Sequence, residues 1–199
     1  MTSIPILREM NKPLLVVVTG SPASGKTTLV HILGHKIHCP ILSRDEIKEG
    51  YINTLNLAHN QLDTSADMHV YDTFFEAIEL LISKGISIII EAAFQDKLWR
   101  PRLLNLLSKA AVRIIICKTN PDLVKGRFIN RLSINPNRGK YYGDQSLSLS
   151  PERFSSLVEN YVPVNVDAPT LQVDTTDNYN PAIDEIINFI KQETSSKKG

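Results

Sequence analysis

Short runs of aliphatic residues recur along the chain, and longer amphipathic stretches separate them. Three runs are rich in Val or Ile and are bounded by Gly, Lys or Asn, which is typical of buried strands in a parallel sheet. These runs are Leu14–Thr19, Ile86–Ile90 and Arg113–Cys117. Two weaker candidates, Pro40–Ser43 and Thr170–Val173, bring the number of expected strands to five.

The stretches between these runs repeat their apolar residues at three- and four-residue spacing, as amphipathic helices do. The clearest helix ends before Gly85, and its apolar face consists of Tyr71, Phe74, Phe75, Ile78, Leu81 and Ile82. Another begins at Asn120-Pro121, a cap followed by a proline at the first helical position. A last helix is expected over about Pro181–Lys191.

One helical pattern contains a proline. Pro101 lies inside Lys97–Lys109, and we expect that helix to begin later than its apolar pattern because proline disrupts helix interiors. The alternation of strands and helices predicts an α/β protein of three layers. Its five-stranded parallel sheet would carry helices on both faces.

Length and composition fit one globular domain. With 199 residues, 42% hydrophobic and 22% charged, we expect a single domain over residues 1–192 and a flexible tail over 193–199. Lys plus Arg total 22 against 21 for Asp plus Glu, so a strong attraction to nucleic acid or an anionic membrane is not expected.

The same features bear on cellular location. The run Leu14–Val18 is far too short to span a bilayer, so we expect no membrane partner. Cys39 and Cys117 fit no metal or redox spacing. Thiols of this kind indicate a reducing cytoplasm.

The strongest motif follows the first expected strand. Residues 20–27, GSPASGKT, match G-x-x-x-x-G-K-[ST] and stand between a strand and a helix, where this phosphate-binding loop belongs. Its backbone amides would surround the phosphates of ATP, Lys26 would reach the outer phosphates, and the Thr27 hydroxyl would hold Mg²⁺. We therefore expect nucleotide contacts from Gly20, Ser21, Pro22, Ala23, Ser24, Gly25, Lys26, Thr27 and Thr28.

Other motifs decide what is done with the nucleotide. A GTPase would need D-x-x-G and N-K-x-D motifs, and CKTNPD (117–122) has the right letters in the wrong order. The stretch LSRDEIKEG (42–50) instead places Asp45 just after the second expected strand, on the acceptor side of the phosphate loop. Asp45 could deprotonate or orient an acceptor hydroxyl, and Lys48 could bind an anionic acceptor. The alternative is that Ser43 and Asp45 only cap a helix.

GSPASGKTT together with LSRDEIKEG resembles the small P-loop kinases of the AAA-type group. These include phage-type polynucleotide 5′-kinases, zeta-toxin sugar-nucleotide kinases and chloramphenicol phosphotransferase. The resemblance implies that Asp45 is the general base and that Lys48 stands where polynucleotide kinases carry an acceptor-binding arginine. Lysine lacks the bidentate geometry of arginine, which argues against a nucleic-acid acceptor.

The resemblance also implies roles for three further residues. Glu91, in SIIIEAAF (87–94), matches an acidic residue that contacts the acceptor or a metal-bound water, although any strand emerging into solvent can end in an acid. Arg127 and Arg131 share one helical face and match lid arginines that cover the phosphoryl group. The lid loop would span residues 136–150, and Arg127 and Arg131 are better candidates than Arg138. The alternative is a solvated basic helix and a plain loop.

The sequence therefore predicts an ATP- and Mg²⁺-dependent kinase that phosphorylates a hydroxyl of a small molecule or nucleoside-like acceptor. Lys26, Asp45, Arg127 and Arg131 would be catalytic, and Asp45, Lys48 and Glu91 would contact the acceptor. The polar segment Tyr51–Val70 would help to shape the acceptor pocket. Two alternatives remain: a polynucleotide 5′-hydroxyl kinase, and an ATP-binding regulatory module without turnover. The sequence leaves the oligomeric state open.

Overall fold

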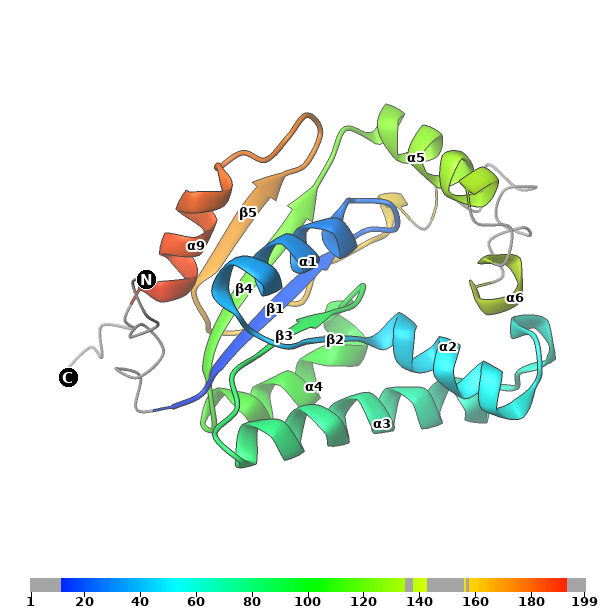
Figure 1. Cartoon of the computed structure of the whole chain (residues 1–199), viewed down its shortest axis with the longest axis horizontal. Coiled ribbons are helices and arrows are strands. Elements are labelled where there is room, and N and C mark those ends of the chain that lie inside the picture. The colour runs from blue at the N-terminus through cyan, green and yellow to red at the C-terminus, as the bar shows by residue number, and fades with distance from the viewer. Residues whose placement is uncertain (1–11, 135–137, 143–155, 157, 193–199) are drawn as a thin grey trace.

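The computed structural model describes residues 12–134, 138–142, 156 and 158–192. It contains one five-stranded sheet, and every strand pairing in it is parallel. The strands lie in the order β2-β3-β1-β4-β5 (Figure 1). Their bounds are Leu14–Gly20 for β1, Ile41–Ser43 for β2, Ile88–Glu91 for β3, Ala111–Lys118 for β4 and Thr170–Asp174 for β5. The expected α/β fold and its five strands are confirmed.

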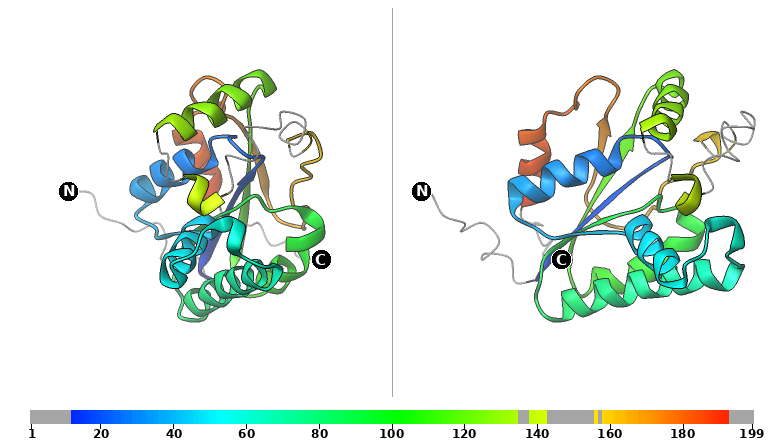
Figure 2. Two further views of the ribbon diagram at one scale, coloured as in Figure 1. Left: turned by 90° about the vertical axis from the view of Figure 1, so that its right-hand side faces the viewer. Right: turned by 45° about the vertical axis from the view of Figure 1, so that its right-hand side comes forward.

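Helices cover both faces of the sheet and make the three expected layers (Figures 1 and 2). The helices α3 (Thr64–Ser83) and α4 (Asp96–Leu107) lie on one face, and α1 (Lys26–Ile37) and α9 (Ile183–Lys191) lie on the other. Beyond the β2 edge, α2 (Arg44–Leu55) packs on α3. Further helices are the 3₁₀ helix η1 (His59–Gln61), α5 (Pro121–Ile134) and α6 (Arg138–Tyr142).

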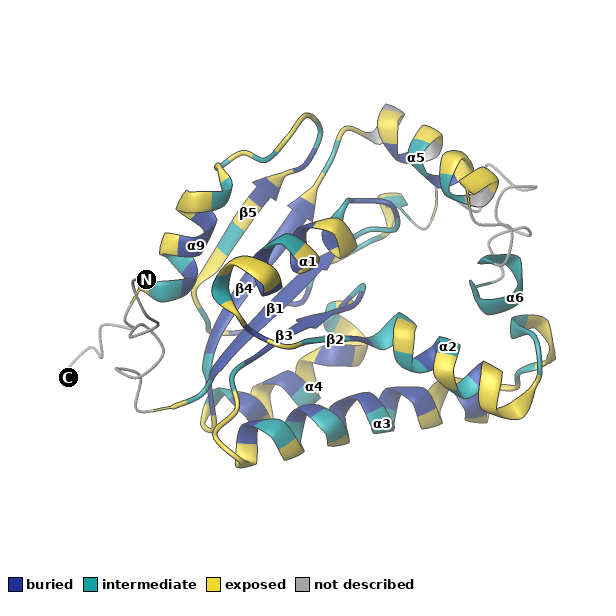
Figure 3. Ribbon diagram, viewed as in Figure 1, coloured by how far each residue is buried: buried dark blue, intermediate teal, exposed yellow. Residues whose placement is uncertain are grey.

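The central strand β1 is buried along its whole length (Figure 3). Because successive side chains of a strand point to opposite faces, β1 contributes to both cores. Leu15 and Val17 pack toward α3 and α4, whereas Leu14 and Val16 pack toward α1 and α9. Burial on both faces explains why the strands read as continuous aliphatic runs rather than alternating ones.

The register of the strands aligns the residues at the carboxyl edge of the sheet. Glu91 on β3 pairs with Val18 on β1 and with Ser43 on β2, and Gly20 pairs with Cys117 on β4. From β1 the chain runs to β2 and β3 on one side and to β4 and β5 on the other. Such a switch in strand order opens a crevice at the carboxyl ends of the strands, which is where open α/β sheets bind ligands.

The expectation that Pro101 delays its helix is wrong. Helix α4 begins at Asp96, one residue before the apolar pattern, and runs through Pro101. The amide that proline lacks would bond to the Lys97 carbonyl. Both residues lie on the exposed side of α4, where water can serve that carbonyl, while the buried side chains Trp99, Leu103 and Leu106 hold the opposite side against the core.

Other boundaries shift by small amounts. The polar segment Tyr51–Val70 is the end of α2, then η1, then the start of α3, whose cap Asp63 accepts a hydrogen bond from the Ala66 amide at 2.9 Å. The last helix starts at Ile183, two residues after Pro181.

Some expectations fall outside the described residues. These are the tail 193–199 and, of the expected lid loop, residues 136–137 and 143–150. The single domain over residues 1–192 stays a prediction. Within the described ranges, none of the helices combines the length and apolar character needed to cross a bilayer.

Candidate functional site: a phosphate loop facing a carboxylate-lined helix

The loop between β1 and α1 has the backbone geometry of an anion-binding nest. Ala23 and Gly25 adopt left-handed conformations, with φ of 60° and 80°, and Ser24 lies between them. Such alternation turns successive amides toward one side of the loop. Helix α1 begins after Gly25 without a side-chain cap and without an acidic residue in its first turn. Within the described residues, no side chain caps the start of this helix, which fits a bound phosphate.

Gly20 is required because the loop closes tightly on itself. A Cβ atom at this position would lie 2.3 Å from Ser24 Oγ and 2.7 Å from the Cys117 carbonyl oxygen. Ser24 Oγ is buried and has no hydrogen-bond partner in the described part of the chain. Since a larger residue at position 20 would displace Ser24, the motif glycine determines how closely the loop can wrap an anion.

Residues from distant parts of the chain hydrogen-bond to the phosphate loop and to the end of β1 and hold them in place. The hydroxyl of Thr19 at the end of β1 is hydrogen-bonded to the Tyr161 hydroxyl and accepts from the Phe94 amide at 2.9 Å. Tyr161 is partly buried, and burial raises its pKa to about 12. On the other side, Thr175 donates to the Ser24 carbonyl at 2.7 Å. The nest is therefore held at both ends by neutral hydrogen-bonding groups.

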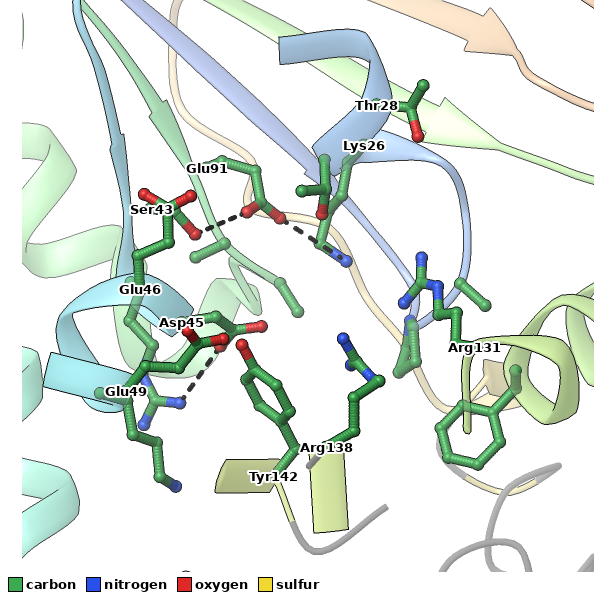
Figure 4. Close-up of a pocket in the computed structure, with 18 of the residues that line it drawn as sticks. Lys26, Thr28, Ser43, Asp45, Glu46, Glu49, Glu91, Arg131, Arg138 and Tyr142 are labelled. Carbon is green, nitrogen blue, oxygen red and sulfur yellow. Dashed lines mark hydrogen bonds and ion pairs between the residues drawn. The ribbon is translucent and has the colours of Figure 1, made fainter. Parts of the chain in front are cut away.

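Glu91 is a buried carboxylate at the centre of the crevice. It is 2% exposed, accepts a hydrogen bond from Ser43 Oγ at 2.9 Å, and lies 3.9 Å from Lys26 Nζ (Figure 4). Lys26 Nζ also donates to the Ser21 carbonyl at 3.3 Å. Burial raises the pKa of Glu91, and the positive charge of Lys26 opposes that shift. This contact joins the phosphate loop to the strands β2 and β3.

A pocket of about 620 Å³ opens in front of Glu91. The first turns of α2 line one side of it with three carboxylates, Asp45, Glu46 and Glu49 (Figure 4). Burial and the neighbouring charges of Glu46 and Asp45 raise the pKa of Glu49. The pocket thus places hydrogen-bond acceptors opposite the cationic phosphate loop.

The two cations of α2 turn toward another carboxylate. Lys48 is buried and lines the pocket, but its Nζ donates to Asp67 Oδ1 on α3 at 2.8 Å. Arg44 Nη2 donates to the same oxygen at 3.0 Å, and Arg44 Nη1 lies 3.6 Å from Asp45. Lys48 and Arg44 lower the pKa of Asp67, although burial acts against them. Asp67 therefore takes up much of the positive charge that an anionic acceptor would need.

Helices α5 and α6 complete the wall of the pocket, and α6 also contacts α2. Arg131 of α5 lines the pocket, and so do Arg138 and Tyr142 of α6 (Figure 4). Arg127 is not among the lining residues. Its guanidinium donates to the carbonyls of Thr175 and Thr176 at 2.7 and 2.9 Å and to Thr119 Oγ1 at 3.2 Å. The two arginines of α5 thus lie in different surroundings.

The structure brings most of the expected site residues into one cavity. Those lining it are Pro22, Ala23, Lys26, Thr27, Thr28, Asp45, Lys48, Glu91 and Arg131. Gly20 ends β1, Ser21, Ser24 and Gly25 belong to the loop that follows, and none of these four lines the pocket.

Sequence reasoning overlooked several lining residues and ranked Arg138 below Arg127. Glu46 and Glu49 carried a usable signal, because they lie within one helical turn of Asp45. Trp99 carried none, since it comes from a distant segment, and Tyr142 was indicated only as part of the expected lid loop over residues 136–150.

Comparisons with known proteins agree with this architecture. A family model described as an AAA domain matches residues 15–140. A candidate kinase from Chloroflexus aurantiacus has a TM-score of 0.74 and 24% identity, covering 92% of this chain and 100% of that one. A sugar kinase from Janibacter sp. has a TM-score of 0.61 and 17% identity, with coverage of 89% and 94%.

A third similar structure is the APS kinase of Mycobacterium tuberculosis in complex with AMPPNP and APS. Its TM-score is 0.60 and its identity 13%, with coverage of 91% of this chain and 99% of that one. At these identities the likeness shows the fold alone. A search of curated proteins finds no significant match.

The raised pKa of Glu91 has a measurable consequence. The folded state favours the protonated carboxyl, so the stability contributed by this group falls as pH rises from the usual glutamate range through the raised pKa. In Glu91→Gln this pH-dependent loss of stability is absent, because glutamine does not titrate. We expect the free energy of unfolding of the variant, relative to the natural protein, to increase between about pH 5 and about pH 8, measured by denaturant titration.

Glu76→Gln is the matched control, because Glu76 is exposed on α3 away from the pocket. Its difference from the natural protein should stay constant over the same range. Parallel stability curves for Glu91→Gln and the natural protein would contradict the prediction.

Proposed function

The chain belongs to the AAA domain family and has the fold of P-loop kinases, and we propose that it transfers the γ-phosphoryl group of ATP to a hydroxyl of a small molecule. One observation carries the proposal. A single cavity is lined by Lys26 of the phosphate loop and by Asp45 of α2, with Glu91 between them. Cys39 and Cys117 are buried free thiols, which fits a cytoplasmic enzyme.

The loop and α1 would hold the triphosphate. The loop amides of Gly20–Gly25, to which Pro22 contributes no N–H, would surround the inner phosphates. Lys26 would reach the γ-phosphoryl group by leaving its contact with the Ser21 carbonyl. Thr27, exposed at the start of α1 and lining the pocket, is the residue that would hold Mg²⁺. The metal would neutralise charge on the phosphate oxygens.

Asp45 would act on the acceptor. Its side chain is 50% exposed and lines the pocket, so an acceptor hydroxyl can reach it. The proton passes from the hydroxyl to Asp45 as the acceptor oxygen bonds to the γ-phosphorus, and the bond from that phosphorus to the bridging oxygen breaks to leave ADP. Glu91, adjacent to Lys26, would position its ammonium group for this transfer.

The two arginines of α5, Arg127 and Arg131, would have different roles. Arg131 lines the pocket and would stabilise charge on the transferring group. Arg127 holds the carbonyls of Thr175 and Thr176, and Thr175 in turn contacts the phosphate loop. We therefore assign Arg127 a positioning role, acting through the segment after β5 rather than on the phosphoryl group itself.

The charges on α2 favour an unphosphorylated acceptor. Asp45, Glu46 and Glu49 would repel a phosphate at this end of the pocket, and Asp67 already pairs with Lys48 and Arg44. A hydroxyl-rich or amine-bearing compound would instead donate hydrogen bonds to these carboxylates. This argues against an oligonucleotide with its chain of phosphodiesters.

Loss of the loop lysine tests the nucleotide site. Lys26→Ala should lower turnover of MgATP by on the order of 10²–10³-fold, because it removes a preorganised positive charge from the transferring group. Lys36→Ala, on the exposed side of the same helix, is the matched control. Calorimetry with MgATP and ADP release report binding and turnover. Unchanged affinity and rate in Lys26→Ala would refute the phosphate-loop assignment.

Loss of the Asp45 charge tests the transfer step. Asp45→Asn keeps the shape but cannot accept a proton, so transfer should fall by about 10²–10⁴-fold while MgATP still binds. Glu76→Gln again serves as the control. If Asp45→Asn binds MgATP and transfers the phosphoryl group at the natural rate, Asp45 does not act in the transfer step.

A panel of candidate acceptor compounds tests which chemical class of acceptor the protein phosphorylates. We expect ADP release with unphosphorylated compounds, represented by myo-inositol, streptamine and adenosine, in preference to an oligonucleotide ending in a 5′-hydroxyl. Preference for the oligonucleotide, with affinity that falls steeply with salt, would identify a polynucleotide kinase instead. Binding of ATP without ADP release from any acceptor would indicate a regulatory module.

A further inference from the structure

Side chains of the short helix α6 donate two hydrogen bonds to Asn53 of α2. Tyr141 Oη donates to Asn53 Oδ1 at 2.8 Å, and Lys140 Nζ donates to the same oxygen at 3.3 Å. The segment η1 also contacts α6. A helix of five residues is too short to be stable by itself, so its position depends on what it packs against. The Asn53 amide therefore contributes directly to where α6 lies.

The other side of α6 faces the pocket. Arg138 and Tyr142 both line it, and the Arg138 guanidinium lies over the Tyr142 ring, 4.3 Å from the ring centroid. Figure 4 shows Tyr142 pointing toward Asp45 and Glu49 of α2. The charge of Arg138 also acts on Glu49, where it opposes the raised pKa of that carboxyl. One face of α6 thus meets Asn53 while another faces the carboxylates.

We propose that Asn53 is a positioning residue of the acceptor site, and that Tyr142, which it places opposite Asp45, contacts the acceptor and determines which acceptor fits. The assignment of an acceptor to this space rests on the proposed function. The placement of α6 by Asn53 does not.

The chemistry of Tyr142 suits this role. Its hydroxyl both donates and accepts hydrogen bonds, whereas the facing carboxylates of Asp45, Glu46 and Glu49 only accept when ionised. An acceptor between them can donate to the carboxylates and still pair with the phenol. Hydroxyl-rich compounds meet both demands, and the aromatic ring supplies an apolar wall.

The experiment uses Trp99, the single tryptophan of the chain, which lines the same pocket and is 6% exposed. Acrylamide quenching of its fluorescence measures how open the pocket is. Asn53 is exposed, so Asn53→Ala leaves the core intact, and Tyr141→Phe removes one donor. Thr54→Ala is the matched control on α2, because its hydroxyl donates to the Gly50 carbonyl within that helix.

Tyr141→Phe loses one hydrogen bond, which should shift the docking equilibrium of α6 about two- to tenfold, and Asn53→Ala loses two, so its shift should be at least as large. We expect a higher quenching constant in Asn53→Ala and in Tyr141→Phe, and the natural value in Thr54→Ala. The quenching constant of the double variant Asn53→Ala/Tyr141→Phe should be close to the higher of the two single-variant values, because Asn53 and Tyr141 act through one contact. Quenching in both single variants equal to that of Thr54→Ala would overturn the positioning role, whether or not ADP is formed.

Kinetics test the contact with the acceptor. Tyr142→Phe should leave quenching unchanged and alter the relative rates of ADP release with myo-inositol, streptamine and adenosine, with KM for ATP unchanged. The same order of acceptors in Tyr142→Phe and the natural protein would overturn the role of Tyr142. If none of these compounds gives ADP release, the proposed function and the acceptor role of Tyr142 are refuted. If quenching is still altered in Asn53→Ala, the positioning of α6 by Asn53 holds independently of that result.

Discussion

Glu91 connects the phosphate loop to the strands β2 and β3 at the carboxyl edge of the sheet. Its carboxylate is buried at the end of β3, hydrogen-bonded to Ser43 and close to the Lys26 ammonium group. A buried charge is tolerated only when it is paired and hydrogen-bonded, so these partners constrain one another. The parallel register of β2 and β3 makes the arrangement possible, because it sets Ser43 beside Glu91. Displacing either strand by one residue would turn these side chains to the opposite face.

The electric field of the pocket is asymmetric. Amides and Lys26 make the loop side positive, while Asp45, Glu46 and Glu49 make the α2 side negative. An ATP-dependent transfer needs positive potential where the phosphates lie and a proton acceptor where the hydroxyl lies. By pairing with Lys48 and Arg44, Asp67 maintains this asymmetry from outside the pocket.

Support for the site comes from residues that never enter it. Tyr161 and Thr175 hold the two ends of the phosphate loop, and Arg127 holds the segment that carries Thr175. Asn53 does the same for α6. In each case a side chain satisfies backbone or hydroxyl groups of a second segment, so the geometry of the pocket depends on contacts made outside it.

Local patterns in the sequence were sufficient for the strands, the phosphate loop and most helices, because burial on both faces of a sheet and the backbone demands of an anion nest leave short, contiguous signatures. Pro101 was misjudged because a single residue does not reveal that its helix exposes the affected carbonyl. No local pattern indicated that Lys48 pairs with Asp67 or that Arg127 and Arg131 lie in different surroundings. Nor did any local pattern indicate that Tyr142 faces Asp45. These features depend on side chains from segments far apart in the chain, and only the packing of α2, α5 and α6 around the sheet decided them.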